Sequence, residues 1–71
     1  MKHKMIILNS GGDSKMEWDP SDEAEITQAR TEFEALQTKG YVAFSPQGKA
    51  RLDSFQPEQE EILMVPRLVG G

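Results

Sequence analysis

Two short runs of apolar residues stand near the two ends of the 71-residue chain, at 5–8 and 62–65. Each run has the length of a β-strand, and in neither do apolar and polar residues alternate. Strands that are apolar at consecutive positions are typical of the interior of a sheet, because both of their faces are then covered. The pattern therefore predicts that the first and the last strand of this chain are central in one sheet.

A cluster of turn-forming residues, 9–13, follows the first apolar run and predicts a hairpin loop. The segment 15–18 after this loop alternates polar and apolar side chains, as a strand with one buried face does. We therefore expect Met16 and Trp18 to point inward, with Trp18 at least partly against the apolar face of the helix that follows.

The signals for a helix begin at Asp19, whose side chain can cap free backbone N–H groups, and continue with Pro20, which suits the first helical position because it has no N–H group. Ser21 is the alternative cap. The helix is expected to end at Lys39, because Gly40 is suited to the C-terminal cap. The apolar residues of this segment recur at helical spacing and form one stripe: Ile26, Ala29, Phe33 and Leu36.

Strand-forming residues at 41–45 and 50–55 flank the turn 46–49 and predict a second hairpin. A polar connection leads to the last strand, 61–65, and Pro66 ends its ladder of hydrogen bonds. The predicted order is therefore ββαβββ. A single helix stripe covers one face of a mixed four- to five-stranded sheet, which makes a two-layer α+β domain.

Composition excludes several kinds of function. The chain has no cysteine, so it cannot hold a disulfide or a thiolate zinc site, and the lack of thiols suits a cytoplasmic location. Its net charge is −4, and its 8 basic residues are scattered among 12 acidic ones, so we expect no nucleic acid as a partner. The apolar runs are shorter than a signal peptide or a membrane span requires, so we expect no membrane partner either.

Side chains with catalytic potential are few. His3 is the one histidine, and its place between two lysines predicts a solvated side chain on which no metal site can be built. The serines have no histidine partner in a plausible arrangement for nucleophilic catalysis. Gly11-Gly12 lacks the lysine and helix of a phosphate-binding loop and is expected to form a turn. We therefore expect that the protein is not an enzyme and holds no cofactor.

The sequence ends with Arg67-Leu68-Val69-Gly70-Gly71. Two adjacent glycines at a terminus arise by chance in roughly 0.5% of chains. A carboxylate on two residues that lack Cβ can thread a slot too narrow for any side chain, where an ATP-using enzyme can reach it. The alternatives are a frayed terminus, because small residues are tolerated at chain ends, and a chain cut at this point.

Together, the element order and the tail resemble the β-grasp of ubiquitin, with an N-terminal hairpin, a central helix, further strands and a central last strand before Gly-Gly. Ubiquitin ends in Arg-Leu-Arg-Gly-Gly, and this chain matches it at four of these five positions, with Val69 in place of the second arginine. The segment from Glu61 to Gly71 is also similar to the ends of the bacterial sulfur carriers for thiamin and molybdopterin. The resemblance implies a β-grasp domain over 1–66 and a diglycine tail over 67–71.

This resemblance implies a protein that is activated rather than one that catalyses. An E1-like adenylating enzyme would bind the domain, and the Gly71 carboxylate would attack ATP, which the activating enzyme supplies. A protein modifier would then be joined to a target protein by an isopeptide bond, whereas a sulfur carrier would form a C-terminal thiocarboxylate and serve a sulfur-accepting enzyme. We favour the modifier. The remaining tail residues would serve recognition by the activating enzyme: Gly70, Val69, Leu68 and Arg67.

A third hypothesis is a structural or assembly protein, for example phage-related, that uses the fold only as an interface. The exposed edge of its sheet would pair with a strand of a partner, and the diglycine would then be incidental. Acidic side chains on the helix and in 58–61 could steer the domain onto a basic partner, although a solvated surface explains them more simply.

Overall fold

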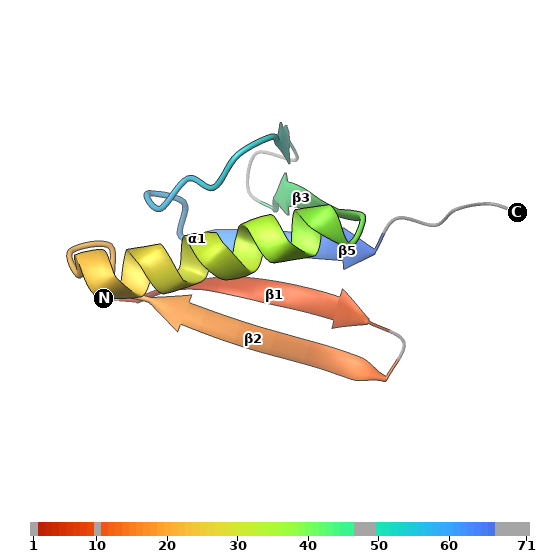
Figure 1. Cartoon of the computed structure of the whole chain (residues 1–71), viewed down its shortest axis with the longest axis horizontal. Helices are drawn as coiled ribbons and strands as arrows, with labels where there is room; N and C mark the ends of the chain where they lie inside the picture. The colour runs from red at the N-terminus through yellow and green to blue at the C-terminus, as the bar shows by residue number, and fades with distance from the viewer. Residues whose placement is uncertain (1, 10, 47–49, 67–71) are drawn as a thin grey trace, which may run out of the picture.

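The computed structural model of the protein describes residues 2–9, 11–46 and 50–66. Within them, one helix and one five-stranded sheet form two layers (Figure 1). The elements follow the chain in this order: β1 (His3–Asn9), β2 (Gly12–Trp18), α1 (Glu23–Thr38), β3 (Tyr41–Ser45), β4 (Ala50–Leu52) and β5 (Glu61–Pro66). The predicted order ββαβββ and the α+β class are confirmed.

The strands are arranged in the order β2-β1-β5-β3-β4. β1 and β5 lie side by side and run parallel, whereas every other neighbouring pair is antiparallel. The sheet is therefore mixed, and both apolar runs of the sequence are in its interior, as predicted. Because β5 separates β1 from β3, the sheet is complete only when the last strand has been inserted.

The core lies between α1 and one face of the sheet, and the predicted helix stripe faces it: Ile26, Ala29, Phe33 and Leu36. The sheet contributes alternate residues of its central strands: Met5, Ile7, Ala43, Ile62 and Met64. Trp18 and Phe33 are both 0% exposed, and Met16 packs against the same cluster. The inward orientation predicted for Met16 and Trp18 is confirmed.

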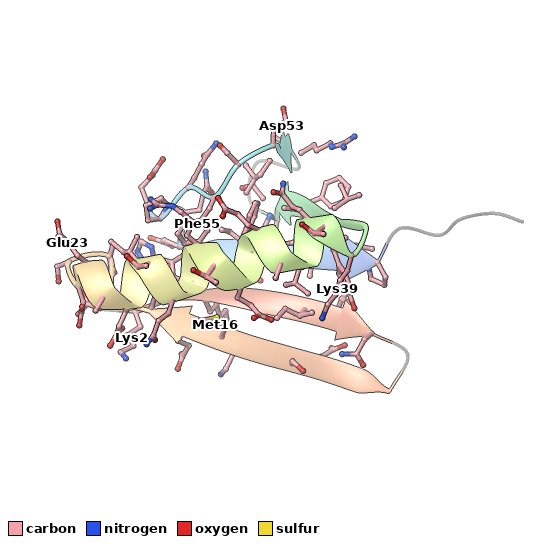
Figure 2. The ribbon with its side chains drawn as sticks, viewed as in Figure 1. Lys2, Met16, Glu23, Lys39, Asp53 and Phe55 are labelled. Atoms are coloured by element: carbon pink, nitrogen blue, oxygen red, sulfur yellow. The ribbon has the colours of Figure 1, made fainter. Side chains whose placement is uncertain are left out.

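Phe55 departs from the prediction, because the expected strand 50–55 ends at Leu52. The chain then leaves the sheet and places Phe55 beside α1 (Figure 2). The centroid of its ring lies 5.1 Å from that of Trp18 and 5.7 Å from that of Phe33. Contacts of this kind add to the stabilisation that burial of the rings provides, so the loop conformation gains aromatic packing that a continued strand would lose.

His3 is not the solvated side chain that the sequence predicts. It is half-buried, and its Nδ1 lies 2.9 Å from the carbonyl oxygen of Pro57. The Trp18 Nε1–H donates to the same oxygen at 3.1 Å, and the two rings meet edge to face. The shared acceptor comes from the loop before β5, which is distant in sequence from both rings.

The helix begins at Glu23, later than the predicted Pro20, because Asp22 is the cap. The Asp22 carboxylate accepts from the backbone N–H of Ala24 at 3.0 Å and from that of Glu25 at 3.3 Å. These are two of the N–H groups that have no partner within the helix itself. The prediction of Asp19 or Ser21 as the cap is therefore wrong.

Asp19 instead stabilises a turn before the helix. Its carboxylate accepts from the hydroxyl of Ser21 at 2.6 Å and from the backbone N–H of Ser21 at 2.9 Å. These two hydrogen bonds lower the pKa of the Asp19 carboxyl below its ordinary value. At the other end of α1, Gly40 has a φ of 101°, which glycine adopts without strain, so its predicted place after the helix is confirmed.

Replacing Asp22 with alanine should lower the free energy of unfolding by about 0.5–2 kcal/mol, because the two N–H groups lose their acceptor. Asp13→Ala is the matched control, since Asp13 is an exposed aspartate on β2. Urea denaturation of both variants measures the difference. Equal losses in the two variants would show that the Asp22 cap does not stabilise the helix.

Candidate functional site

The face of the sheet away from α1 carries a group of apolar side chains. They come from alternate residues of β1, β3 and β5, between the residues that build the core. Each of the six is half-buried: Ile6, Leu8, Val42, Phe44, Leu63 and Val65. We call these residues the open-face patch.

The register of the strands places the open-face patch in the middle of the sheet. Ile6 is opposite Leu63, and Leu63 is opposite Phe44, so one apolar row crosses β1, β5 and β3. At its two ends, this row meets Lys15 on β2 and Arg51 on β4. An apolar centre with a charged border is the usual composition of a surface that contacts another molecule.

The open-face patch continues toward the end of β5. Val65 is opposite Val42 on β3, and β5 ends at the next residue, Pro66. The chain continues from Pro66 into 67–71. A molecule that bound this tail would therefore meet the open-face patch next to the point where the tail begins.

Opposite charges border the patch near the start of β1. Lys4 is paired with Glu17 on one side and with Glu61 on the other. The Lys4 Nζ lies 3.9 Å from Oε1 of Glu61, and both side chains are partly exposed. Exposed ion pairs of this kind contribute at most about 1 kcal/mol to folding. This border therefore contributes little to the stability of the domain.

The residues predicted for covalent attachment and for tail recognition lie outside the described residues: Gly71, Gly70, Val69, Leu68 and Arg67. The structure describes the strand that precedes them, through Pro66. It therefore establishes which strand leads to the tail and which side chains surround the end of that strand.

The sequence interpretation missed the open-face patch, because strands that are apolar at consecutive positions are ordinarily covered on both faces. The same apolar runs nevertheless indicate that a second apolar face exists. The chain has one helix stripe, which is enough for one face of a sheet, whereas the runs 5–8 and 62–65 are apolar on two faces. The second face is left without a cover from the described part of the chain.

Other features of the described residues are less distinctive. Within 2–9, 11–46 and 50–66, no three histidine, aspartate or glutamate side chains are placed to hold a metal ion, and no buried side-chain nitrogen or oxygen lacks a hydrogen-bond partner. A groove of about 340 Å³ lies between α1 and the loop before β5, and it is lined by Glu23, Ile26, Thr27, Arg30 and Pro57. The hydroxyl of Thr27 in this lining donates to the backbone carbonyl oxygen of Glu23 at 2.9 Å.

No known protein family, curated protein or solved structure matches this chain. No helix in the part of the chain that the structure describes is long and apolar enough to cross a membrane. The fold itself therefore defines the class of protein. It is a small α+β domain in which one helix covers one face of a mixed sheet and an apolar patch lies on the other face.

Proposed function

We propose that this protein is a ubiquitin-like protein modifier, in which an E1-like enzyme adenylates the C-terminal Gly71 carboxylate and the acyl group is then transferred to a target protein. The position of β5 carries the proposal. This strand lies between β1 and β3 in the interior of the sheet, and the chain continues from it directly into Arg67-Leu68-Val69-Gly70-Gly71. A tail that begins at a central strand has a fixed origin, which a partner enzyme can locate.

Three features of the fold support a β-grasp arrangement. The hairpin of β1 and β2 precedes the helix, and the last strand is central and parallel to the first. α1 lies across one face of the sheet (Figure 1). The hairpin before the helix and the central last strand are also features in which the sequence resembles ubiquitin, so the fold and the tail support the same function.

The tail is suited to reach into an enzyme. Its five residues extend by at most about 18 Å, and the two that lack Cβ can pass through a narrow slot. In that slot, a carboxylate oxygen of Gly71 would attack the α-phosphorus of ATP, and pyrophosphate would leave. An enzyme thiolate would then displace AMP from the acyl group, and a lysine amine of the target would displace the thiolate and form an isopeptide bond.

The open-face patch supplies the surface by which the activating enzyme would hold the domain. Apolar side chains at the centre of an interface provide most of its affinity, and the charged border orients the partner. Acidic residues on and before α1 can attract a basic enzyme surface over a longer range: Asp22, Glu23, Glu25, Glu32 and Glu34.

Protein isolated from its native cell tests this proposal by intact mass and after tryptic digestion. The intact mass first establishes whether the native chain ends at Gly71. We expect larger covalent species and peptides in which a target lysine carries Leu68-Val69-Gly70-Gly71, because trypsin cleaves after Arg67. Cells that produce the chain without Gly71 are the control and should contain neither product.

Three other outcomes would contradict the modifier hypothesis. A free species in which sulfur replaces one carboxyl oxygen would favour a sulfur carrier. An unmodified terminus found solely within a stoichiometric particle would favour an assembly protein that uses the fold as an interface. Covalent species that persist without Gly71 would place the attachment at another residue.

A further inference from the structure

β2 borders the sheet along its whole length. It pairs with β1, and Figure 1 shows no other described element on its outer side. The opposite border strand, β4, has 3 residues, whereas β2 has 7 and contains no proline. The backbone N–H and C=O groups along such an edge can bond to a strand of another molecule. Of the two described edges, β2 is therefore the one that offers room for a further strand.

The hydrogen bonds of β1 determine which groups of β2 face outward. The Lys4 N–H donates to the carbonyl oxygen of Glu60 at 3.0 Å, on the side of β5. Backbone groups alternate in direction along a strand, so those of Met5 point to β2, where Met16 is opposite. Met16 therefore directs its backbone groups to β1. Its two neighbours along β2, Lys15 and Glu17, direct theirs outward from the free edge, in the plane of the sheet.

The residues of β2 whose backbone groups face outward alternate in charge: Asp13, Lys15 and Glu17. All three are exposed. In an antiparallel pair of strands, opposite charges that face each other are stabilising and like charges are destabilising. A strand that fits this edge therefore has a basic residue opposite Glu17 and an acidic residue opposite Lys15. A second copy of β2, shifted so that its Lys15 faces Glu17, meets this requirement.

We propose that β2 pairs antiparallel with β2 of a second copy of this chain, about a two-fold axis at Met16. Lys15 of each copy then faces Glu17 of the other, and these residues exchange backbone hydrogen bonds. Met16 faces Met16 of the second copy on the α1 side of the sheet, where it is half-buried (Figure 2). Two five-stranded sheets become one continuous sheet, with both helices on the same side.

Registers centred on Asp13, Ser14, Lys15 and Glu17 also match the outward backbone groups, and each is less favourable. Pairing centred on Asp13 or on Glu17 would set that acidic residue against its own copy. Pairing centred on Lys15 would set the two lysines against each other and the acidic residues against each other. Pairing centred on Ser14 would set Lys15 against Asp13, but it would leave Met16 opposite Gly12, which has no side chain to cover it. The Met16 register combines opposite charges with an apolar contact across the axis.

Charge variants of the full chain test this pairing. Lys15→Glu and Glu17→Lys each set like charges opposite one another, so each alone should self-associate at least about tenfold more weakly than the wild type. An equal mixture of the two variants restores opposite charges at both positions and should form a heterodimer as tightly as the wild type self-associates. Lys39→Glu is the control for Lys15→Glu, because it makes the same change of charge at an exposed residue outside β2.

Sedimentation velocity over a concentration series up to about 1 mM measures the association. We expect the wild type to form a dimer within this range. A wild type that stays monomeric throughout would overturn the proposal, and so would a mixture of the two charge variants that stays monomeric. Because this experiment measures self-association of the chain with no activating enzyme present, these outcomes are separate from those of the proposed function.

Single cysteines test the register, since the chain has none of its own. Met16→Cys would place two thiols at a non-hydrogen-bonded pair whose Cα atoms are about 4.5 Å apart, within the range for a disulfide. Mild oxidation should therefore convert Met16→Cys into a covalent dimer at least about tenfold faster than Ser14→Cys. Faster cross-linking of Ser14→Cys would overturn the Met16 register.

Discussion

Replacing Phe33 with alanine should lower the free energy of unfolding by about 3–5 kcal/mol. Phe33 is 0% exposed and lies at the centre of the cluster that joins α1 to the sheet. Its removal would leave a cavity that the surrounding side chains cannot fill without moving. A single core in a domain of this size supplies only about 3–5 kcal/mol of net stability, so most of the variant should be unfolded at room temperature.

The fluorescence of Trp18 measures this change, because Trp18 is the one tryptophan of the chain and is 0% exposed in the folded domain. The emission of the Phe33→Ala variant should lie at the longer wavelength of a solvated tryptophan. Phe44→Ala is the matched control, since it removes the same ring from the half-buried open-face patch. Equal thermal stability of the two variants would contradict the placement of Phe33 in the core.

Gly70→Val should leave the domain folded and abolish adenylation by the cognate E1-like enzyme. A branched side chain at this position would block a slot shaped for glycine. The sheet itself should be unaffected, because Gly70 follows the end of β5 at Pro66. ATP–pyrophosphate exchange measures the activation step directly, since the exchange requires reversible formation of the acyl-adenylate.

Gly11→Ala is the matched control for this experiment. A Cβ built at Gly11 would lie 3.6 Å from Oδ1 of Asn9, an ordinary contact, so this variant should fold and be activated normally. Arg67→Ala is a milder change and should weaken enzyme binding by about 1–3 kcal/mol if the arginine forms a charge-assisted hydrogen bond. Equal exchange rates for Gly70→Val and the wild type would show that the terminal carboxylate is not the reactive group.

Periodicity and turn chemistry were sufficient to predict the order of the elements. The alternation at 15–18 identified the inward side chains of Met16 and Trp18, and the consecutive apolar residues identified the central strands. Gly40 marked the end of the helix because its backbone conformation there favours glycine. Each of these signals depends on interactions between near neighbours in the sequence.

The start of the helix could not be predicted as well, because Asp19, Ser21 and Asp22 are all good capping residues. The choice depends on the turn that precedes the helix, in which Asp19 accepts both hydrogen bonds from Ser21 and leaves Asp22 free to cap. Local preferences do not distinguish these candidates, whereas the geometry of the turn does.

The contacts of Phe55 and His3 also depend on the tertiary structure. Phe55 has the composition of a strand residue, yet it packs on rings from β2 and α1. His3 shares an acceptor with Trp18 that the loop before β5 supplies. Neither neighbour is close in sequence, so no periodic pattern could indicate these contacts.

For the candidate site, the sequence of the last five residues alone reveals the diglycine tail. The surfaces around the end of β5 depend on the order of the strands. The open-face patch becomes continuous because β5 lies between β1 and β3. β2 is available to a second copy because it is at the border of the sheet. Strand order is set by contacts across the whole chain, and no local pattern specifies it.

A ribosome that makes this chain delivers β5 only after every other strand. Before β5 is synthesised, no strand joins the β1–β2 hairpin to the β3–β4 pair. The core also lacks Ile62 and Met64, which β5 contributes. Pairing of β1 with β5 connects residues from opposite ends of the domain, and such distant contacts slow folding. Chains that stop before β5 leave β1 and β3 without the strand that joins them and are open to proteolysis. Chains that reach Pro66 can complete the sheet.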